Sequence, residues 1–111
     1  MLASKIYRVT RELPDEERYG LTRQIRRAAI SVASNVAEGS ARSRRAEFIH
    51  FLHIARGSLT ELETQVSIAM ELKMLRPEHR LEEDIREIGR MLTGLIRRLI
   101  EHRPVDRVVR S

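Results

Sequence analysis

The sequence of 111 residues has no cysteine and no tryptophan, with only two phenylalanines and two tyrosines. Without cysteine, the chain has neither a disulfide framework nor a zinc site built on thiolates. Its longest uncharged run, residues 28–37, contains polar side chains and is far shorter than the ~20 apolar residues that a membrane span needs. No signal peptide is recognisable at the start. We therefore expect a cytoplasmic protein that has no membrane partner.

Lysine is also scarce, because Lys5 and Lys73 are the only two in the chain, so arginine supplies nearly all of the basic charge. The formal net charge is +5, and 33% of the residues are charged. Guanidinium groups suit planar, bidentate contacts with phosphate or carboxylate. This composition favours nucleic acid or an acidic protein surface as a partner. The alternative is an ordinary solvated surface encoded by an arginine-favouring genome.

Apolar residues, by contrast, make up 41% of the chain and recur at steps of three and four, which predicts helices and no strand. Pro14 ends the first helix, Gly39 ends the second, Pro77 begins the fourth and Pro104 ends it. The expected helices span about 2–13, 22–38, 44–75 and 77–102. Short connections make neighbours antiparallel, so we predict an all-α, up-down-up-down four-helix bundle over residues 1–103. Residues 104–111 would form a loose basic tail.

Several apolar residues lie outside the inward-facing stripes of these helices. Ile54, Ile68 and Leu75 follow heptad spacing on the third helix, with Leu72 beside them, and Ile30 points into an arc of arginines on the second. A row at this spacing indicates a partner helix. We therefore predict a subunit interface at Ile30, Ile54, Ile68, Leu72 and Leu75. The first helix is also too short for the others, so either N-terminal residues are missing or another subunit covers the excess.

The sequence offers little for catalysis. Glu47, His50 and His53 follow the Glu-x-x-His spacing of di-metal bundle proteins, but such a site needs a second copy and further inward glutamates. Surface histidines are the favoured interpretation, and a metal enzyme using these three residues is the alternative. The serines at positions 31, 34, 58 and 67 lie within predicted helices, and no glycine-rich phosphate loop occurs. We expect no enzyme, no metal and no cofactor. Glycines inside the helices, at positions 57, 89 and 94, are expected to allow close helix packing.

Arginine clustering is the strongest functional feature. Residues 21–45 contain six arginines and a single acid, Glu38, a net charge of +5. Such groups contact phosphates without reading sequence, and their binding weakens steeply with salt. No aromatic residues are interleaved with them, so we do not expect base stacking. The alternative is a solvated face. The candidate nucleic-acid-binding residues are Arg23, Arg26, Arg27, Arg42, Arg44 and Arg45, and a second patch is predicted at Arg97, Arg98, Arg103, Arg107 and Arg110.

Three segments carry a family resemblance. They read Ser34-Asn35-Val36-Ala37-Glu38-Gly39, Glu47-Phe48-Ile49-x-Phe51-Leu52 and Ala55-x-Gly57-Ser58-Leu59-x-Glu61-Leu62. The chain resembles the four-helix-bundle, ribosomal-protein-S23-like proteins of intervening sequences in bacterial large-subunit ribosomal RNA genes. The accessory variability protein of diversity-generating retroelements is related to them. Family members usually have further residues before the position of Ala3, which favours a misassigned start codon here.

The resemblance implies a homopentameric ring with a basic surface. In the retroelement relative, that surface is associated with nucleic acid and a reverse transcriptase. Our leading hypothesis is a non-enzymatic, oligomeric, basic helical scaffold that binds RNA or DNA through phosphate contacts without strong sequence readout. The alternative is a protein-interaction adaptor, for example a partner of a reverse transcriptase, with no direct nucleic-acid role.

Overall fold

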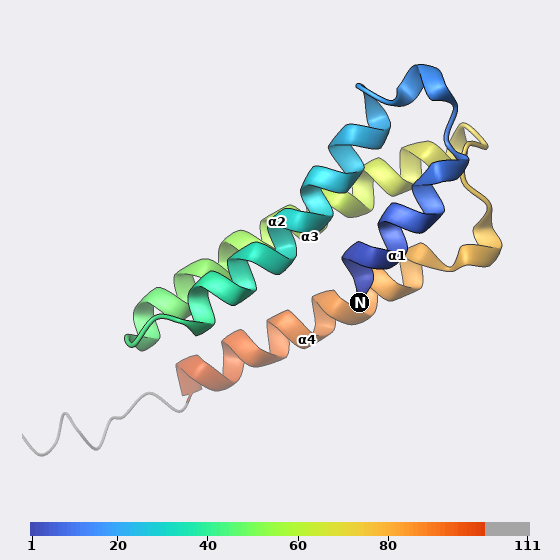
Figure 1. The fold of residues 1–111 in the computed structure, drawn as a ribbon. Helices are drawn as coiled ribbons and strands as arrows, with labels where there is room; N and C mark the ends of the chain where they lie inside the picture. The colour runs from blue at the N-terminus through green and yellow to red at the C-terminus, as the bar shows by residue number, and fades with distance from the viewer. Residues whose placement is uncertain (102–111) are drawn as a thin grey trace, which may run out of the picture.

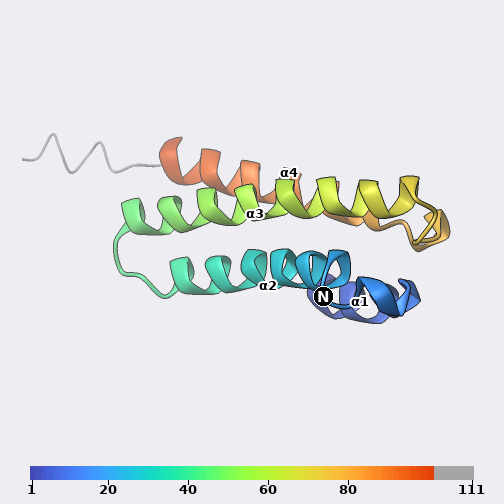
Figure 2. The same cartoon turned by 90° about the horizontal axis from the view of Figure 1, so that it is seen from above.

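The computed structural model describes residues 1–101, and every regular element in this range is helical. Short 3-10 helices, η1 (Thr10–Glu12), η2 (Asp15–Glu17) and η3 (Pro77–His79), occur in the connections. The four α-helices are α1 (Leu2–Val9), α2 (Leu21–Ser40), α3 (Arg45–Glu71) and α4 (Leu81–Glu101). Consecutive α-helices run in opposite directions (Figure 1), with α1 and α2 in one layer and α3 and α4 in the other (Figure 2). The predicted all-α arrangement of four packed helices is confirmed.

The first helix is shorter than predicted. Its α-helical part ends at Val9, and the chain tightens into η1 before reaching Pro14. The buried Thr10 hydroxyl donates a hydrogen bond to the Ile6 carbonyl over 2.7 Å, a bond that competes with regular helix propagation. Leu13 is extended, as the residue before a proline prefers to be. The predicted end of the last helix at His102 and the predicted tail lie outside the described residues.

The third helix also ends earlier than predicted, and this corrects one interface residue. Lys73 adopts a left-handed conformation with φ of 62°, and the Met74 N–H donates to the Ala69 carbonyl over 2.8 Å, which closes α3 in a left-handed cap. The turn carries Leu75 into the core, where it is 3% exposed. The prediction that Leu75 belongs to an exposed heptad row is therefore wrong, because the row assumed a helix that continues through it.

The core is aliphatic and includes side chains from all four helices. Ion pairs hold the first helical segment against the start of α4 and the connection before it. The Lys5 ammonium lies 2.6 Å from the Asp84 carboxylate, and Glu12 accepts hydrogen bonds from Arg76 at 2.8 Å and His79 at 2.6 Å. The hydrogen bond from Arg76 lowers the pKa of Glu12 below its usual value. Since this carboxylate sits on η1, it fastens the end of the short first helix to the α3–α4 connection. The largest fully buried apolar side chains are Ile6, Ile25, Leu52, Leu62, Val66 and Ile85.

The α2–α3 contact depends on small side chains. The hydroxyls of Ser31 and Ser58 are hydrogen-bonded at 2.7 Å, and Asn35 donates to the Ser31 carbonyl at 2.8 Å within its own helix. Gly39 does not end α2 as predicted, because it lies inside the helix with an ordinary φ. A Cβ at Gly39 would lie 2.7 Å from the Phe51 Cβ. This glycine is therefore required by the close approach of the two helices.

The interior glycines of α3 and α4 have other surroundings. A Cβ on Gly57 would have nothing within 4 Å, so the predicted close packing at this position is wrong within the described chain. On α4, a Cβ at Gly89 would make ordinary contact with Leu59 at 3.5 Å, and one at Gly94 would lie 3.8 Å from the Arg98 guanidinium. A Cβ atom would thus have free space at Gly57 and would clash at Gly39, so the two positions can be compared directly.

We expect Gly39→Ala to destabilise the protein by about 1–2 kcal/mol, because the clash with Phe51 outweighs the gain in helix propensity. The matched variant Gly57→Ala should stabilise it by about 1 kcal/mol, since it brings the propensity gain without a clash. Urea unfolding followed by circular dichroism measures both. A Gly39→Ala protein as stable as the unmodified protein would contradict the α2–α3 approach described above.

The mismatch in helix lengths is smaller than predicted and is largest for α1. Helices α2 and α4 have 20 and 21 residues, whereas α3 has 27 and α1 has 8. Helix α1 therefore covers α2 and α4 only at one end of the bundle (Figure 1). Partly buried apolar side chains, including Val36, Leu95 and Leu99, pack onto the core.

No helix within residues 1–101 combines the length and apolar content needed to cross a membrane.

Candidate functional site

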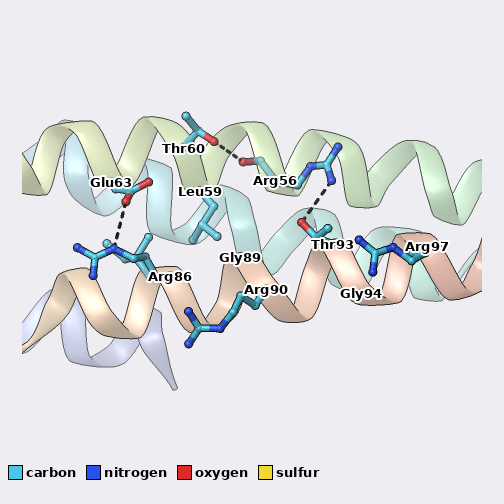
Figure 3. Close-up of a pocket in the computed structure, with 11 residues that line it drawn as sticks. Arg56, Leu59, Thr60, Glu63, Arg86, Gly89, Arg90, Thr93, Gly94 and Arg97 are labelled. Carbon is cyan, nitrogen blue, oxygen red and sulfur yellow. Dashed lines mark hydrogen bonds and ion pairs between the residues drawn. The ribbon is translucent and has the colours of Figure 1, made fainter.

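A basic groove of about 560 Å³ lies between α3 and α4 (Figure 3). Its base contains the core residues Leu59 and Ile85, and the two threonines Thr60 and Thr93 stand on its walls. Four arginines line it against one acid, Glu63, so the groove has a formal charge of +3 from its lining. We call this feature the α3–α4 groove. The lining arginines are Arg56, Arg86, Arg90 and Arg97.

Two of these arginines are held by neighbours and two are not. Arg56 donates to the Thr93 hydroxyl at 3.4 Å and contacts the His53 ring nitrogen Nδ1 at 3.1 Å. Arg86 lies 3.9 Å from a Glu63 carboxylate oxygen across the groove. The side chains of Arg90 and Arg97 are exposed, and their guanidinium groups make no ion pair or hydrogen bond within residues 1–101. Their donors are therefore available to a bound anion.

The helix sequences explain why the groove is open. Gly89 and Gly94 both line it from α4, so these two positions place no side chain over the base of the groove (Figure 3). The groove residues of α4 recur at steps of one, three and four, which keeps them on one side of the helix. They include Arg86, Gly89, Arg90, Thr93 and Arg97. Sequence reasoning treated the glycines as packing residues and missed the groove. The α4 spacing of arginines around glycines was the available signal.

The arginines predicted on α2 have different roles from one another. Arg26 is half-buried, donates to the Thr10 hydroxyl at 2.9 Å and to the Tyr7 carbonyl at 3.2 Å, and lies 4.6 Å from the centre of the Tyr7 ring. It holds α1 against α2, so most of its hydrogen-bonding capacity is already used. Arg23 and Arg27 are exposed and make no ion pair within the described part of the chain.

The arginines predicted after α2 lie at the other end of that helix. Arg42 pairs with Glu38 at 2.5 Å and stacks 5.0 Å from the centre of the Phe51 ring. Arg44 is exposed and directly precedes the first residue of α3. Arg45 is half-buried, and its side chain is not free of interactions with the rest of the protein. About 20 Å of helix separates Arg27 from the end of α2 at Ser40, at 1.5 Å per residue. The six predicted arginines therefore form two groups and not one surface. The predicted second patch includes Arg103, Arg107 and Arg110, which lie outside the described residues.

Aromatic side chains do accompany the first of these groups. Tyr7 from α1 and Tyr19 from the connection before α2 line a pocket of about 280 Å³ together with Arg18, Arg23 and Arg27. The sequence places no aromatic residue among the arginines of residues 21–45, but the fold brings two tyrosines from outside that window beside them. Tyr19 precedes that window by two positions, and the fold adds Tyr7.

The histidine-containing motif on α3 lies mostly at the surface. His50 and His53 are exposed, and His50 packs edge-on against Phe51 with ring centres 5.5 Å apart. Within residues 1–101 there is no group of three or more histidine or carboxylate side chains placed to hold a metal ion. His53 instead contacts Arg56, at the edge of the α3–α4 groove.

The predicted interface residues other than Leu75 are on the surface. Ile54, Ile68 and Leu72 are 39%, 43% and 58% exposed, and their spacing places them on one side of α3. Ile30 is 44% exposed but lies one helical turn after Arg26, on the flank of α2 that faces α1. The contact of α2 with α3 runs through Ser31 and Ser58 instead. Ile30 therefore belongs to a different part of the surface from the α3 residues.

These observations define the chain as a small basic helical-bundle protein with an arginine-lined groove. The family model of the 23S rRNA-intervening sequence protein matches residues 1–94, and the chain belongs to this family, as its motifs predicted. A crystal structure of a protein of unknown function from the S23 ribosomal protein family of Bacteroides thetaiotaomicron has a similar fold, with a TM-score of 0.79 and 26% sequence identity. The alignment covers 86% of this chain and 91% of that one. No curated protein matches this chain.

Proposed function

We propose that the protein is a non-enzymatic scaffold that binds nucleic acid by its phosphate backbone, with the α3–α4 groove as the main contact. The single observation that supports this most is that the guanidinium groups of Arg90 and Arg97, which have no partner within residues 1–101, lie beside a concave surface with an excess of positive charge. Guanidinium groups bind phosphate oxygens bidentately, and a groove of one sign of charge attracts a polyanion. Among the described residues that line the groove there is no aromatic side chain, which favours contacts independent of sequence.

A salt titration tests this proposal. A labelled generic RNA duplex and a DNA duplex of the same sequence are titrated with the protein at several salt concentrations, and binding is followed by fluorescence anisotropy. We expect binding at low salt that weakens linearly on a log–log plot, with a slope of about −0.9 for each duplex phosphate contact. The two slopes also compare RNA with DNA. Absence of binding to both duplexes at low salt would contradict the proposal.

Self-association forms part of the proposed function. The support for it is the exposed row of Ile54, Ile68 and Leu72 on α3, since large apolar side chains at helical spacing are typical of a contact with another helix. A ring of subunits, with the pentamer implied by the family resemblance as the expected form, would repeat the α3–α4 groove several times. Repeated grooves on one assembly would bind a long polyanion far more tightly than a single groove does.

The alternative function is a protein-interaction adaptor, for example a partner of a reverse transcriptase. The same exposed apolar row favours it, because the fully buried core of a protein–protein interface is apolar, whereas apolar side chains make no ion pair or hydrogen bond with a phosphate. Nuclease treatment distinguishes the two functions. An adaptor keeps its partner after nuclease digestion, whereas a partner held through nucleic acid is released.

A further inference from the structure

We propose that the pocket between α1 and the start of α2 binds an unpaired base of single-stranded nucleic acid together with its phosphate. This inference rests on the proposed function and adds to it a second site, a base contact and a preference for single strands. The six side chains that carry the argument are Tyr7, Tyr19, Arg18, Arg23, Arg26 and Arg27. We call this feature the tyrosine pocket.

The two tyrosines come from different elements and are both accessible. Tyr19 stands in the connection between η2 and α2 and is 79% exposed, and Tyr7 is 40% exposed on α1. An exposed ring gains little from packing in the folded chain, whereas stacking of a base on it is worth about 1–3 kcal/mol. Tyr19 is therefore the side chain with most to gain from a bound base.

The floor of the pocket is held in place before any ligand arrives. Arg26 stacks on the Tyr7 ring and donates hydrogen bonds to the Thr10 hydroxyl and the Tyr7 carbonyl. These contacts fix Tyr7 and Arg26 relative to each other across α1 and α2. A preorganised surface loses less conformational entropy when a ligand binds.

The remaining arginines supply the phosphate contacts. The side chains of Arg18, Arg23 and Arg27 are exposed, and none of the three guanidinium groups makes an ion pair or hydrogen bond within residues 1–101. In the described chain, no acidic side chain lines the tyrosine pocket, unlike the α3–α4 groove with its Glu63. Free guanidinium groups beside an exposed ring match the chemistry of a nucleotide, which has an aromatic base and an anionic phosphate.

This chemistry selects unpaired bases. In a duplex the bases are stacked on one another, so their faces are not available to a protein side chain, whereas bases of a single strand can be splayed out onto aromatic rings. The α3–α4 groove and the tyrosine pocket would therefore bind different parts of the nucleic acid. The α3–α4 groove contacts phosphates of any strand, and the tyrosine pocket contacts a base only where the strand is open.

Two single strands of equal length test the inference, one ordinary and one abasic, because the abasic strand keeps the phosphates and lacks the bases. Fluorescence anisotropy measures the affinity of each strand for the unmodified protein and for Tyr19→Leu, a variant that keeps apolar bulk at an exposed position. We expect the ordinary strand to bind roughly five- to 100-fold more tightly than the abasic one. Tyr19→Leu should remove most of this difference and leave the abasic affinity unchanged.

Fluorine NMR gives a second readout that does not depend on affinity. Tyr7 and Tyr19 are the only two tyrosines in the chain, so a protein labelled with fluorotyrosine reports on this pocket alone. The Tyr19 signal, identified by its loss in Tyr19→Leu, should shift when the ordinary strand is added and stay in place with the abasic strand.

The outcomes separate this inference from the proposed function. Equal affinities for the two strands, with an unmoved Tyr19 signal, would overturn base binding and leave phosphate binding intact. If neither single strand nor the duplex binds at low salt, base binding in the tyrosine pocket and the proposed phosphate-binding function are both overturned.

Discussion

The double variant Arg90→Gln/Arg97→Gln is expected to bind a nucleic-acid duplex roughly 10- to 30-fold more weakly at low salt, since it removes two charge-assisted contacts at the protein surface. Both guanidinium groups are unpartnered within residues 1–101, so their removal breaks no ion pair of the folded chain. The slope of log affinity against log salt should fall by about 0.9 for each lost contact. A salt titration followed by anisotropy gives both quantities.

The control for this experiment removes the same charge elsewhere. Arg8→Gln/Arg11→Gln also lowers the formal net charge by two, from +5 to +3, and both side chains are exposed near the end of α1, outside the α3–α4 groove. We expect it to change affinity only slightly. An equal loss of affinity in the two double variants would show that binding follows net charge and not the groove.

The second large effect is expected from Ile68→Glu. Ile68 lies in the exposed apolar row of α3, and a carboxylate there would be buried without a partner if two copies meet on this face. We therefore expect an assembly weakened by more than about 100-fold, with sedimentation equilibrium shifting toward the 12.9 kDa protomer. Because the side chain is 43% exposed in the single chain, the fold itself should tolerate the change.

A matched variant on another helix provides the control. Met91 is 60% exposed on α4, away from the α3 row, so Met91→Glu introduces the same charge without placing it in the proposed contact. We expect this variant to assemble like the unmodified protein. An unmodified protein that sediments as a protomer at every concentration would contradict self-association, and an Ile68→Glu protein that assembles normally would exclude this face.

The arrangement of helices could be predicted because it depends on local patterns. Apolar residues at steps of three and four fix which side of each helix is inward, and short connections fix the direction of the next helix. Helix ends were less predictable. The left-handed conformations of Lys73 and Arg80 close turns without glycine, so the sequence lacks the usual signal there. The misplacement of Leu75 follows directly from this.

The site was predictable only in part, because it depends on residues far apart in the chain. The sequence shows that residues 21–45 are basic, but not that Arg26 is engaged by α1 or that Arg42 is paired with Glu38. The α3–α4 groove requires two helices to be placed side by side, and its arginines are distributed from residue 56 to residue 97. Periodicity gives the face of each helix, whereas the pairing of faces comes from the fold.

Site-specific crosslinking tests the central claim, the contact between phosphates and the α3–α4 groove, most directly. The chain has no cysteine, so single cysteines can be introduced and labelled with a photoreactive group. Thr60 is exposed on the wall of the groove, and Ala37 is exposed on α2. We predict that a duplex crosslinks efficiently to the protein labelled at Thr60→Cys and poorly to the protein labelled at Ala37→Cys. Equal crosslinking, or a preference for position 37, would contradict the account.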